Sequence, residues 1–217
     1  MGIEREIKLA LPPSQHDDVA RFFNERTGPG KPMKLGNVYF DTPSLALAEA
    51  KSALRLRRTP DQWLQTYKTL GEAKAGLHSR HEWELPVQGE ALEIDALIAA
   101  CDDDAARDAL QAAAPELIAL FRTDFTRIVW DMEREGSQIE VALDSGEITA
   151  DVDGETRRAE ISELEVELKS GDADALEMLA AELRGAFPEL DPEDVSKAQR
   201  GYRLRERPES NISDAEA

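Results

Sequence analysis

The sequence predicts an α+β fold in which a β-sheet closes into a barrel or tunnel with a charged interior and helices packed on its outside. Two observations predict this arrangement. Several segments alternate charged and apolar side chains with the period of a β-strand. Other segments carry the apolar stripe of an amphipathic helix and need an apolar surface to pack against. A closed sheet whose apolar face meets the helices and whose charged face points inward satisfies both.

The strands are predicted from alternation, and turn residues set their limits. Strands are predicted over residues 2–10, 34–41, 53–59, 63–69, 79–87, 121–133, 138–144 and 157–169. Pro12 and Pro13 end the first strand. Pro60-Asp61 is a compact turn that suits a hairpin between the third and fourth strands.

Helical segments lie between these strands. Helices are predicted over about 15–25 and 45–51, in two or three short pieces within 90–120, over about 172–186, and in the first part of 192–205. Ser14 can cap the first helix, and we expect the chain to become extended through Tyr202 and Leu204. Cys101 lies on the apolar face of a helix, and Asp102-Asp103-Asp104 is a solvated helix start that suits the helix dipole.

The charged strand faces follow a selective pattern. Side chains that share a face are Glu4, Glu6 and Lys8; Arg55 and Arg57; Arg80, Glu82 and Glu84; and Glu163, Glu165, Glu167 and Lys169. One such strand more often faces water, whereas this set, together with helices that need an apolar surface, favours an enclosed lumen. Burying unpaired ions costs several kcal/mol each, so such a lumen has to be wet or filled by a ligand. Glu163 fits two placements, inside the lumen or past the barrel rim.

The carboxylates are spaced as metal ligands. Two Glu residues separated by one residue on a strand lie about 7 Å apart on one face. A second such pair on a facing strand completes a cage of oxygen ligands that suits Mg²⁺ or Mn²⁺. Three scattered histidines (His16, His78 and His81) and the single cysteine disfavour zinc.

The cations on the other strands suit a phosphorylated substrate. Arg55, Arg57, Lys68, Arg80 and Arg127 supply forked guanidinium groups and a point charge, which match phosphate oxygens. Metal-holding carboxylates beside a basic wall are typical of phosphoryl transfer. The sequence contains no P-loop and no glycine-rich nucleotide loop, which disfavours a nucleotide-binding fold.

Length and charge limit the alternatives. The 217 residues fit one domain, placed at 1–205 with a helical insertion at about 90–120, followed by a flexible tail over 206–217. The net charge of −19 argues against nucleic acid, whose phosphates bind basic surfaces. No apolar run approaches the roughly 20 residues of a bilayer span, and the N-terminus lacks the apolar stretch of a signal peptide. We expect a cytoplasmic protein with no membrane partner, monomeric or homodimeric.

An ordered set of motifs resembles the CYTH, or triphosphate tunnel metalloenzyme, family. The motifs are Glu4-Arg5-Glu6-Ile7-Lys8, Tyr39-Phe40-Asp41-Thr42, Arg55-Leu56-Arg57, Thr66-Tyr67-Lys68, Arg80-His81-Glu82-Trp83-Glu84, Arg127, Asp144, Glu163-Leu164-Glu165-Val166-Glu167 and Ser196-Lys197-Ala198. They extend over nearly all of residues 2–205 and look most like bacterial inorganic triphosphatases. Those proteins often carry a C-terminal helical CHAD domain, and the present chain stops at Ala217 without one.

The resemblance implies an eight-stranded antiparallel tunnel and metal-dependent hydrolysis of inorganic triphosphate to diphosphate and phosphate. The implied metal ligands are Glu4, Glu6, Glu165 and Glu167, with Asp144 holding a second metal or orienting the attacking water. Phosphate oxygens would be bound by Lys8, Arg55, Arg57, Lys68, Arg80, Arg127 and Lys197. Lys8, Asp144 and Lys197 would be catalytic, with Glu82, Glu84 and Glu163 in supporting roles.

One departure affects the predicted substrate. The family often has a lysine at the position of Phe125, and Arg122 could replace that cation. Other triphosphate enzymes on the same scaffold, a thiamine triphosphatase or an adenylate cyclase, stay open as alternatives. So does a polyphosphate-binding module without turnover. An organic substrate would need an apolar or stacking wall at the tunnel mouth, and the sequence offers no clear base-binding motif.

Overall fold

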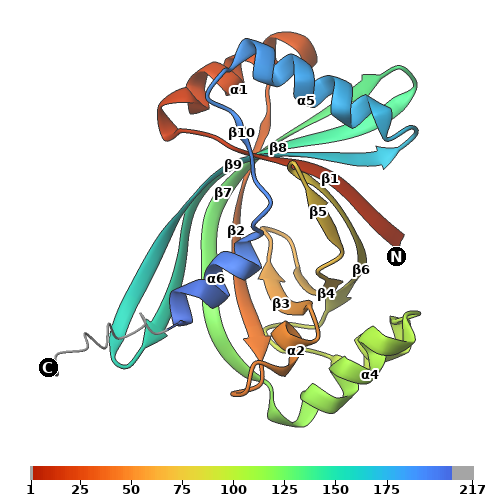
Figure 1. Cartoon of the computed structure of the whole chain (residues 1–217), viewed down its shortest axis with the longest axis vertical. Helices are drawn as coiled ribbons and strands as arrows, with labels where there is room; N and C mark the ends of the chain where they lie inside the picture. The colour runs from red at the N-terminus through yellow and green to blue at the C-terminus, as the bar shows by residue number, and fades with distance from the viewer. Residues whose placement is uncertain (1, 207–217) are drawn as a thin grey trace, which may run out of the picture.

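The computed structural model describes residues 2–206, and its centre is a closed barrel of eight antiparallel strands (Figure 1). The order around the barrel is β1-β9-β8-β7-β2-β3-β4-β6, and β6 pairs with β1 to close it. The barrel strands are β1 (Gly2–Ala10), β2 (Lys31–Asp41), β3 (Ser52–Arg58), β4 (Trp63–Thr69), β6 (Leu77–Val87), β7 (Ile118–Arg134), β8 (Ser137–Val152) and β9 (Glu155–Ser170). The predicted fold class is confirmed.

The strands β7, β8 and β9 run further than the sequence predicted. The predicted strand at 138–144 continues to Val152, paired on both sides. Gly146 interrupts the alternation there, and a Cβ at this position would lie 2.2 Å from the carbonyl oxygen of Asp124. Glycine is therefore required at position 146, because the backbone of β7 approaches it too closely for a side chain, although glycine is a weak strand former. Two short edge strands, β5 (Glu72–Lys74) and β10 (Asp191–Pro192), were not predicted.

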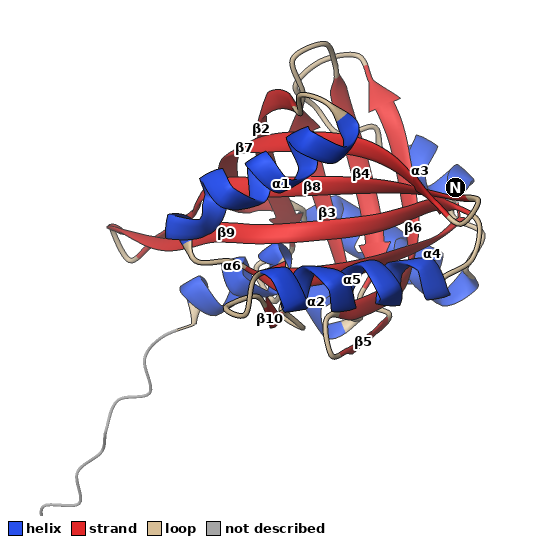
Figure 2. Cartoon of the chain, turned by 90° about the horizontal axis from the view of Figure 1, so that it is seen from above, coloured by secondary structure: helices blue, strands red, loops and turns tan. Residues whose placement is uncertain are grey.

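Most helices cover the outer, apolar face of the barrel, as predicted. They are α1 (His16–Thr27), α2 (Ala46–Glu49), α3 (Ile94–Ala100), α4 (Asp104–Ala113) and α5 (Asp174–Ala186). Helices α1 and α5 lie side by side over β7–β9 (Figure 2), where Phe23 and Leu179 join a core that includes Val141 and Val166. Helices α3 and α4 build a second core, which contains the predicted core residue Cys101.

Helix α6 (Lys197–Arg205) differs from the others, because it packs on the lumen-facing side of β7–β9 at one end of the barrel (Figure 1). Its Tyr202 ring meets Phe121 edge-on at 5.2 Å, and Phe121 in turn stacks on Tyr39 at 4.6 Å. The inner face of the barrel therefore changes from charged to apolar under α6.

Two local predictions were wrong and one was confirmed. The chain stays helical through Tyr202 and Leu204, because a capping box between Ser196 and Gln199 starts α6 and its apolar side chains pack inward. Ser14 does not cap α1; it lies in a 3₁₀ turn (Pro13–Gln15), and Gln15 is the N-cap residue. The acidic start of α4 is confirmed, since the Asp103 side chain accepts a hydrogen bond from Ala106 N at 2.8 Å.

Of the predicted flexible tail, all but Glu206 lies outside the described residues. Within residues 2–206, no helix has the length and apolar character needed to cross a bilayer.

Candidate functional site: a charged barrel lumen

The barrel encloses a cavity of about 450 Å³, within the range of small-molecule sites. Its charged lining includes Glu4, Glu6, Lys8, Arg55, Arg57, Lys68, Arg80, Glu82, Glu84, Arg127, Glu140, Glu165, Glu167, Lys169 and Lys197. The charged strand faces therefore point inward, as the sequence predicted. Asp144 and Glu163 are the predicted site residues that do not border this cavity. They lie beneath it, at 0% and 1% exposure, so the placement of Glu163 past the barrel rim is wrong.

Strand register brings carboxylates together across the wall. Glu167 on β9 lies directly opposite Glu6 on β1 and directly opposite Glu140 on β8. Like charges in this arrangement repel. Burial and the charges of Glu4 and Glu140 raise the pKa of Glu167, although Lys169 opposes them. In this row Arg80 pairs with Glu6 and Lys169 with Glu167, whereas Glu140 forms no ion pair with any of residues 2–206.

The glutamates of β1 form ion pairs with basic residues of β4 and β6. Lys68 Nζ lies 2.8 Å from Glu4 Oε1, and Arg80 Nε lies 2.7 Å from Glu4 Oε2. Burial alone would raise the pKa of Glu4, but Lys68 and Arg80 outweigh it and hold this pKa well below its usual value. Arg80 also donates to Glu6. Glu82 forms an ion pair with Lys68 at 3.0 Å, consistent with a supporting role.

The opposite wall has a surplus of positive charge around Arg57. The Nε of Arg57 donates to Asn37 Oδ1 at 2.8 Å, and within residues 2–206 this guanidinium forms no ion pair. Burial, together with the charges of Arg55 and Arg127, lowers the pKa of Arg57 to about 10. Arg55 reaches Glu84 only at 3.7 Å, and its Nε is buried without a hydrogen-bond partner. An anion in the lumen would satisfy both groups.

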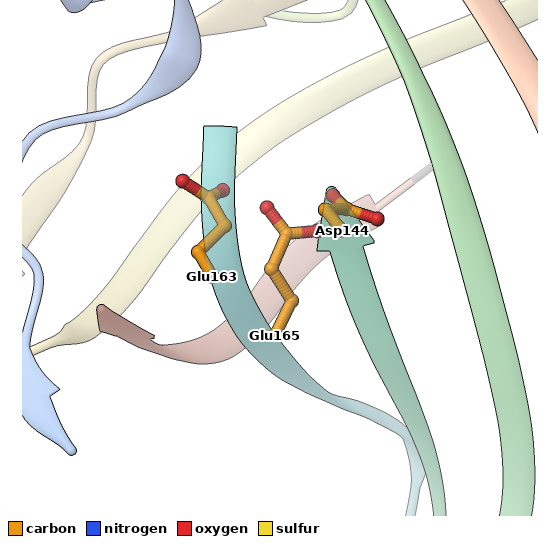
Figure 3. A group of neighbouring side chains, drawn as sticks. All are labelled: Asp144, Glu163 and Glu165. Carbon is orange, nitrogen blue, oxygen red and sulfur yellow. The ribbon is translucent and has the colours of Figure 1, made fainter. Parts of the chain in front are cut away.

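A third group of acids lies midway along β8 and β9 (Figure 3), where Asp144, Glu163 and Glu165 each place a ligand oxygen within 4.8 Å of the others. Arg127 binds both oxygens of Asp144, at 2.7 and 2.6 Å, and also contacts Glu165. Lys197 Nζ lies 2.6 Å from Asp144, 2.9 Å from Glu165 and in contact with Glu163.

Some residues of the site were not predicted. Arg200, one turn after Lys197 on α6, ion-pairs with Glu163. Lys169 lies on the charged face of β9 and pairs with Glu167 at 2.9 Å. The expectation that Arg122 replaces a cation is contradicted, because its side chain is 60% exposed and lies beside Asp124, outside the lumen. The period of two would have shown this, since Arg122 and Arg127 differ by an odd number of residues.

Comparisons with known proteins agree with this geometry. A family model for the CYTH domain matches residues 2–202. Over 206 residues the chain is 35% identical to the inorganic triphosphatase of Haemophilus influenzae, covering 93% of this chain and 54% of that protein. The chain thus spans about half the length of this curated relative.

Solved structures of similar fold include HpAC1 of Hippeastrum, a candidate adenylyl cyclase with a dominant triphosphatase activity. It is 19% identical, with a TM-score of 0.66 over 94% of this chain and 98% of that one. A candidate adenylate cyclase from Bacillus halodurans is 20% identical, with a TM-score of 0.57 over 92% and 98%. At these identities the two structures support the fold alone. With the family model matching almost the whole described chain, this protein belongs to the CYTH domain family.

Proposed function

We propose that the chain hydrolyses inorganic triphosphate to diphosphate and phosphate inside the barrel. The observation that carries this proposal is the enclosed lumen, in which Arg55 and Arg57 lack full anionic partners while acids face them from the other wall. The 35% identity to an inorganic triphosphatase supports the same substrate class.

The cations that line the cavity are the proposed phosphate ligands: Lys8, Arg55, Arg57, Lys68, Arg80, Arg127 and Lys197. Several of these cations form ion pairs with carboxylates of the protein. Their positions are therefore already fixed when a negatively charged ligand binds. Glu82 and Glu84 support this wall, because Glu82 pairs with Lys68 and Glu84 lies beside Arg55.

The acids that line the cavity fit a hard divalent cation, Mg²⁺ or Mn²⁺, since they offer carboxylate oxygens as ligands. Glu4, Glu6, Glu165 and Glu167 are the proposed ligands. The cation would neutralise charge on the phosphate oxygens and so lower the barrier to attack. The repulsion among Glu6, Glu140 and Glu167 supports this, because a cation there would relieve it.

Hydrolysis requires water to attack a terminal phosphorus while the bridging P–O bond breaks and diphosphate leaves. Burial alone would lower the pKa of Lys197, but Asp144, Glu163 and Glu165 raise it above its usual value. Lys197 therefore stays an ammonium group and donates hydrogen bonds to a phosphate oxygen or the attacking water. Lys8 has the same character, since Glu6 and Glu165 outweigh its burial and raise its pKa.

The experiment is phosphate release from triphosphate, ATP and thiamine triphosphate, each with Mg²⁺, with Mn²⁺ and with EDTA. We expect fast, metal-dependent release from triphosphate alone. Release from ATP or thiamine triphosphate at a similar rate would favour the alternative enzymes. Tight triphosphate binding without release would favour a binding module.

A Glu6→Gln variant tests the metal assignment. We expect a loss of kcat of about 100-fold or more, because one proposed ligand is removed, with triphosphate still bound. Unchanged kcat and unchanged metal affinity would contradict the role of Glu6. The cytoplasmic location and the monomeric or homodimeric state stay predictions.

A further inference from the structure

We propose that Asp144 and Glu163, with Phe125, form a socket for the ammonium group of Lys197 and are not metal ligands. Glu163 and Phe125 are then positioning residues that act through Lys197. The part of the inference that concerns rate rests on the proposed triphosphatase function; the part that concerns the socket does not.

The socket surrounds the ammonium group with three carboxylates. Lys197 Nζ donates hydrogen bonds to Glu163 and, at 2.9 Å, to Glu165, and it forms an ion pair with Asp144 at 2.6 Å. These are the same three carboxylates whose oxygens gather within 4.8 Å (Figure 3). Lys197 therefore occupies the centre of the group that would otherwise be the best cation cage among residues 2–206.

An aromatic ring forms another side of the socket. Lys197 Nζ lies 5.1 Å from the ring centroid of Phe125, which is 5% exposed. Ring faces attract ammonium groups at this distance. Mg²⁺, by contrast, keeps several water molecules and needs oxygen ligands around it, which a phenyl ring cannot supply. Phe125 thus favours a lysine over a hydrated divalent ion.

The ion pairs of Asp144 and Glu163, and their position away from the cavity, also indicate that they are not metal ligands. Asp144 and Glu163 by themselves are contacted by four cationic side chains, Lys8, Arg127, Lys197 and Arg200. A divalent ion would add to a group that is already neutralised, and buried excess charge is costly. Asp144 and Glu163 also do not border the cavity, whereas Glu4, Glu6 and Glu167 do. The metal belongs with the cavity-lining acids.

Two isosteric substitutions separate a lysine socket from a metal site. Without metal, Glu163→Gln breaks a buried ion pair, so Tm in EDTA should fall by roughly 5 °C or more. Glu167→Gln relieves repulsion from Glu6 and Glu140 and loses only a partly exposed ion pair with Lys169, so Tm in EDTA should stay or rise. Mn²⁺ titration by calorimetry should give Glu163→Gln an affinity within about 2-fold of wild type, and Glu167→Gln an affinity weakened about 10-fold or more.

Glu147→Gln is the matched control, because Glu147 lies on β8 in an exposed ion pair with Arg158 outside the lumen. It should change neither Tm nor Mn²⁺ affinity measurably. The socket is overturned if Glu163→Gln raises Tm in EDTA or weakens Mn²⁺ binding as Glu167→Gln does.

Kinetics test the positioning role. With triphosphate, Glu163→Gln should lower kcat by about 10- to 100-fold while KM stays within about 3-fold, because the ammonium is misplaced and the other phosphate ligands remain. Phe125→Leu should lower kcat by about 2- to 30-fold, the range of a cation–π contact. Equal losses in kcat for Glu147→Gln would show a nonspecific effect and contradict the role. If wild type does not hydrolyse triphosphate, the proposed function fails, and the Tm and Mn²⁺ measurements still decide the socket.

Discussion

Arg57 shows at the residue scale how this lumen differs from an ordinary ion-pair network. Most of its charged neighbours have an opposite charge within reach, whereas Arg57 donates to the neutral Asn37, which in turn donates to Thr123 at 2.7 Å. Its guanidinium is thus oriented without being neutralised. A group that is fixed in place and keeps its charge is suited to bind an incoming anion.

The substitution Arg57→Gln should weaken triphosphate binding by about 10- to 100-fold, since a hydrogen bond to a charged group contributes roughly 1.5–3 kcal/mol. Calorimetric titration of triphosphate into the protein measures this directly. Arg58→Gln is the control, because Arg58 is the next residue on β3, is exposed and faces the Trp63 ring at 5.9 Å. Equal weakening by both variants would mean that only the overall charge matters.

At the scale of elements, α6 connects the site to the rest of the fold. Its first residue is Lys197, and its Tyr202 hydroxyl donates to the buried Asp41 at 3.0 Å. Asp41 also accepts from the backbone of α2, at Leu47 N (2.8 Å) and Ala48 N (2.9 Å). The position of Lys197 therefore depends on how α6 starts and on what holds its far end.

Removing the N-cap tests this dependence. Ser196→Ala should cost about 1 kcal/mol of unfolding free energy and also lower kcat, since the cap precedes Lys197 directly. Asp103→Ala removes the cap of α4, which lies outside the barrel, and should cost a similar amount without lowering kcat. Urea unfolding and steady-state kinetics on both variants measure the two effects. A similar kcat for both would contradict the link between α6 and the site.

The whole molecule separates its charges between surface and interior. The chain has 45 acidic and 26 basic residues, and many of the basic ones line the lumen. Asp144 is buried and Glu4 and Glu165 are largely enclosed, which by itself would raise each pKa, but neighbouring cations hold each pKa below its usual value. Folding therefore depends on these acids being ionised.

Acid should destabilise the barrel in a defined direction. A carboxyl whose pKa is lower in the folded state stabilises the protein above its unfolded pKa, and this contribution is lost as pH falls. We expect Tm in EDTA to be nearly constant from pH 7 to 5 and to fall below about pH 4. Glu4→Gln should start from a lower Tm at pH 7 and lose less on acidification. A Tm difference between wild type and Glu4→Gln that does not shrink at low pH would contradict this account.

Strand alternation was sufficient to predict the barrel and which of its two faces is charged. Strand alternation has a fixed period, so Glu4, Glu6 and Lys8 had to share a face, and helices with apolar stripes had to cover the other face. The order of motifs indicated the CYTH family. Most candidate site residues followed from these two facts.

Which charges pair could be seen only after the sheet had closed. Periodicity gives the face of a side chain but not its partner across the lumen, which depends on register and on rotamers of long side chains. The folded structure also placed Glu163 in contact with Lys197 and α6 on the inner face of the barrel. Local sequence carries no signal for these contacts, because each joins residues brought together only when the sheet closes.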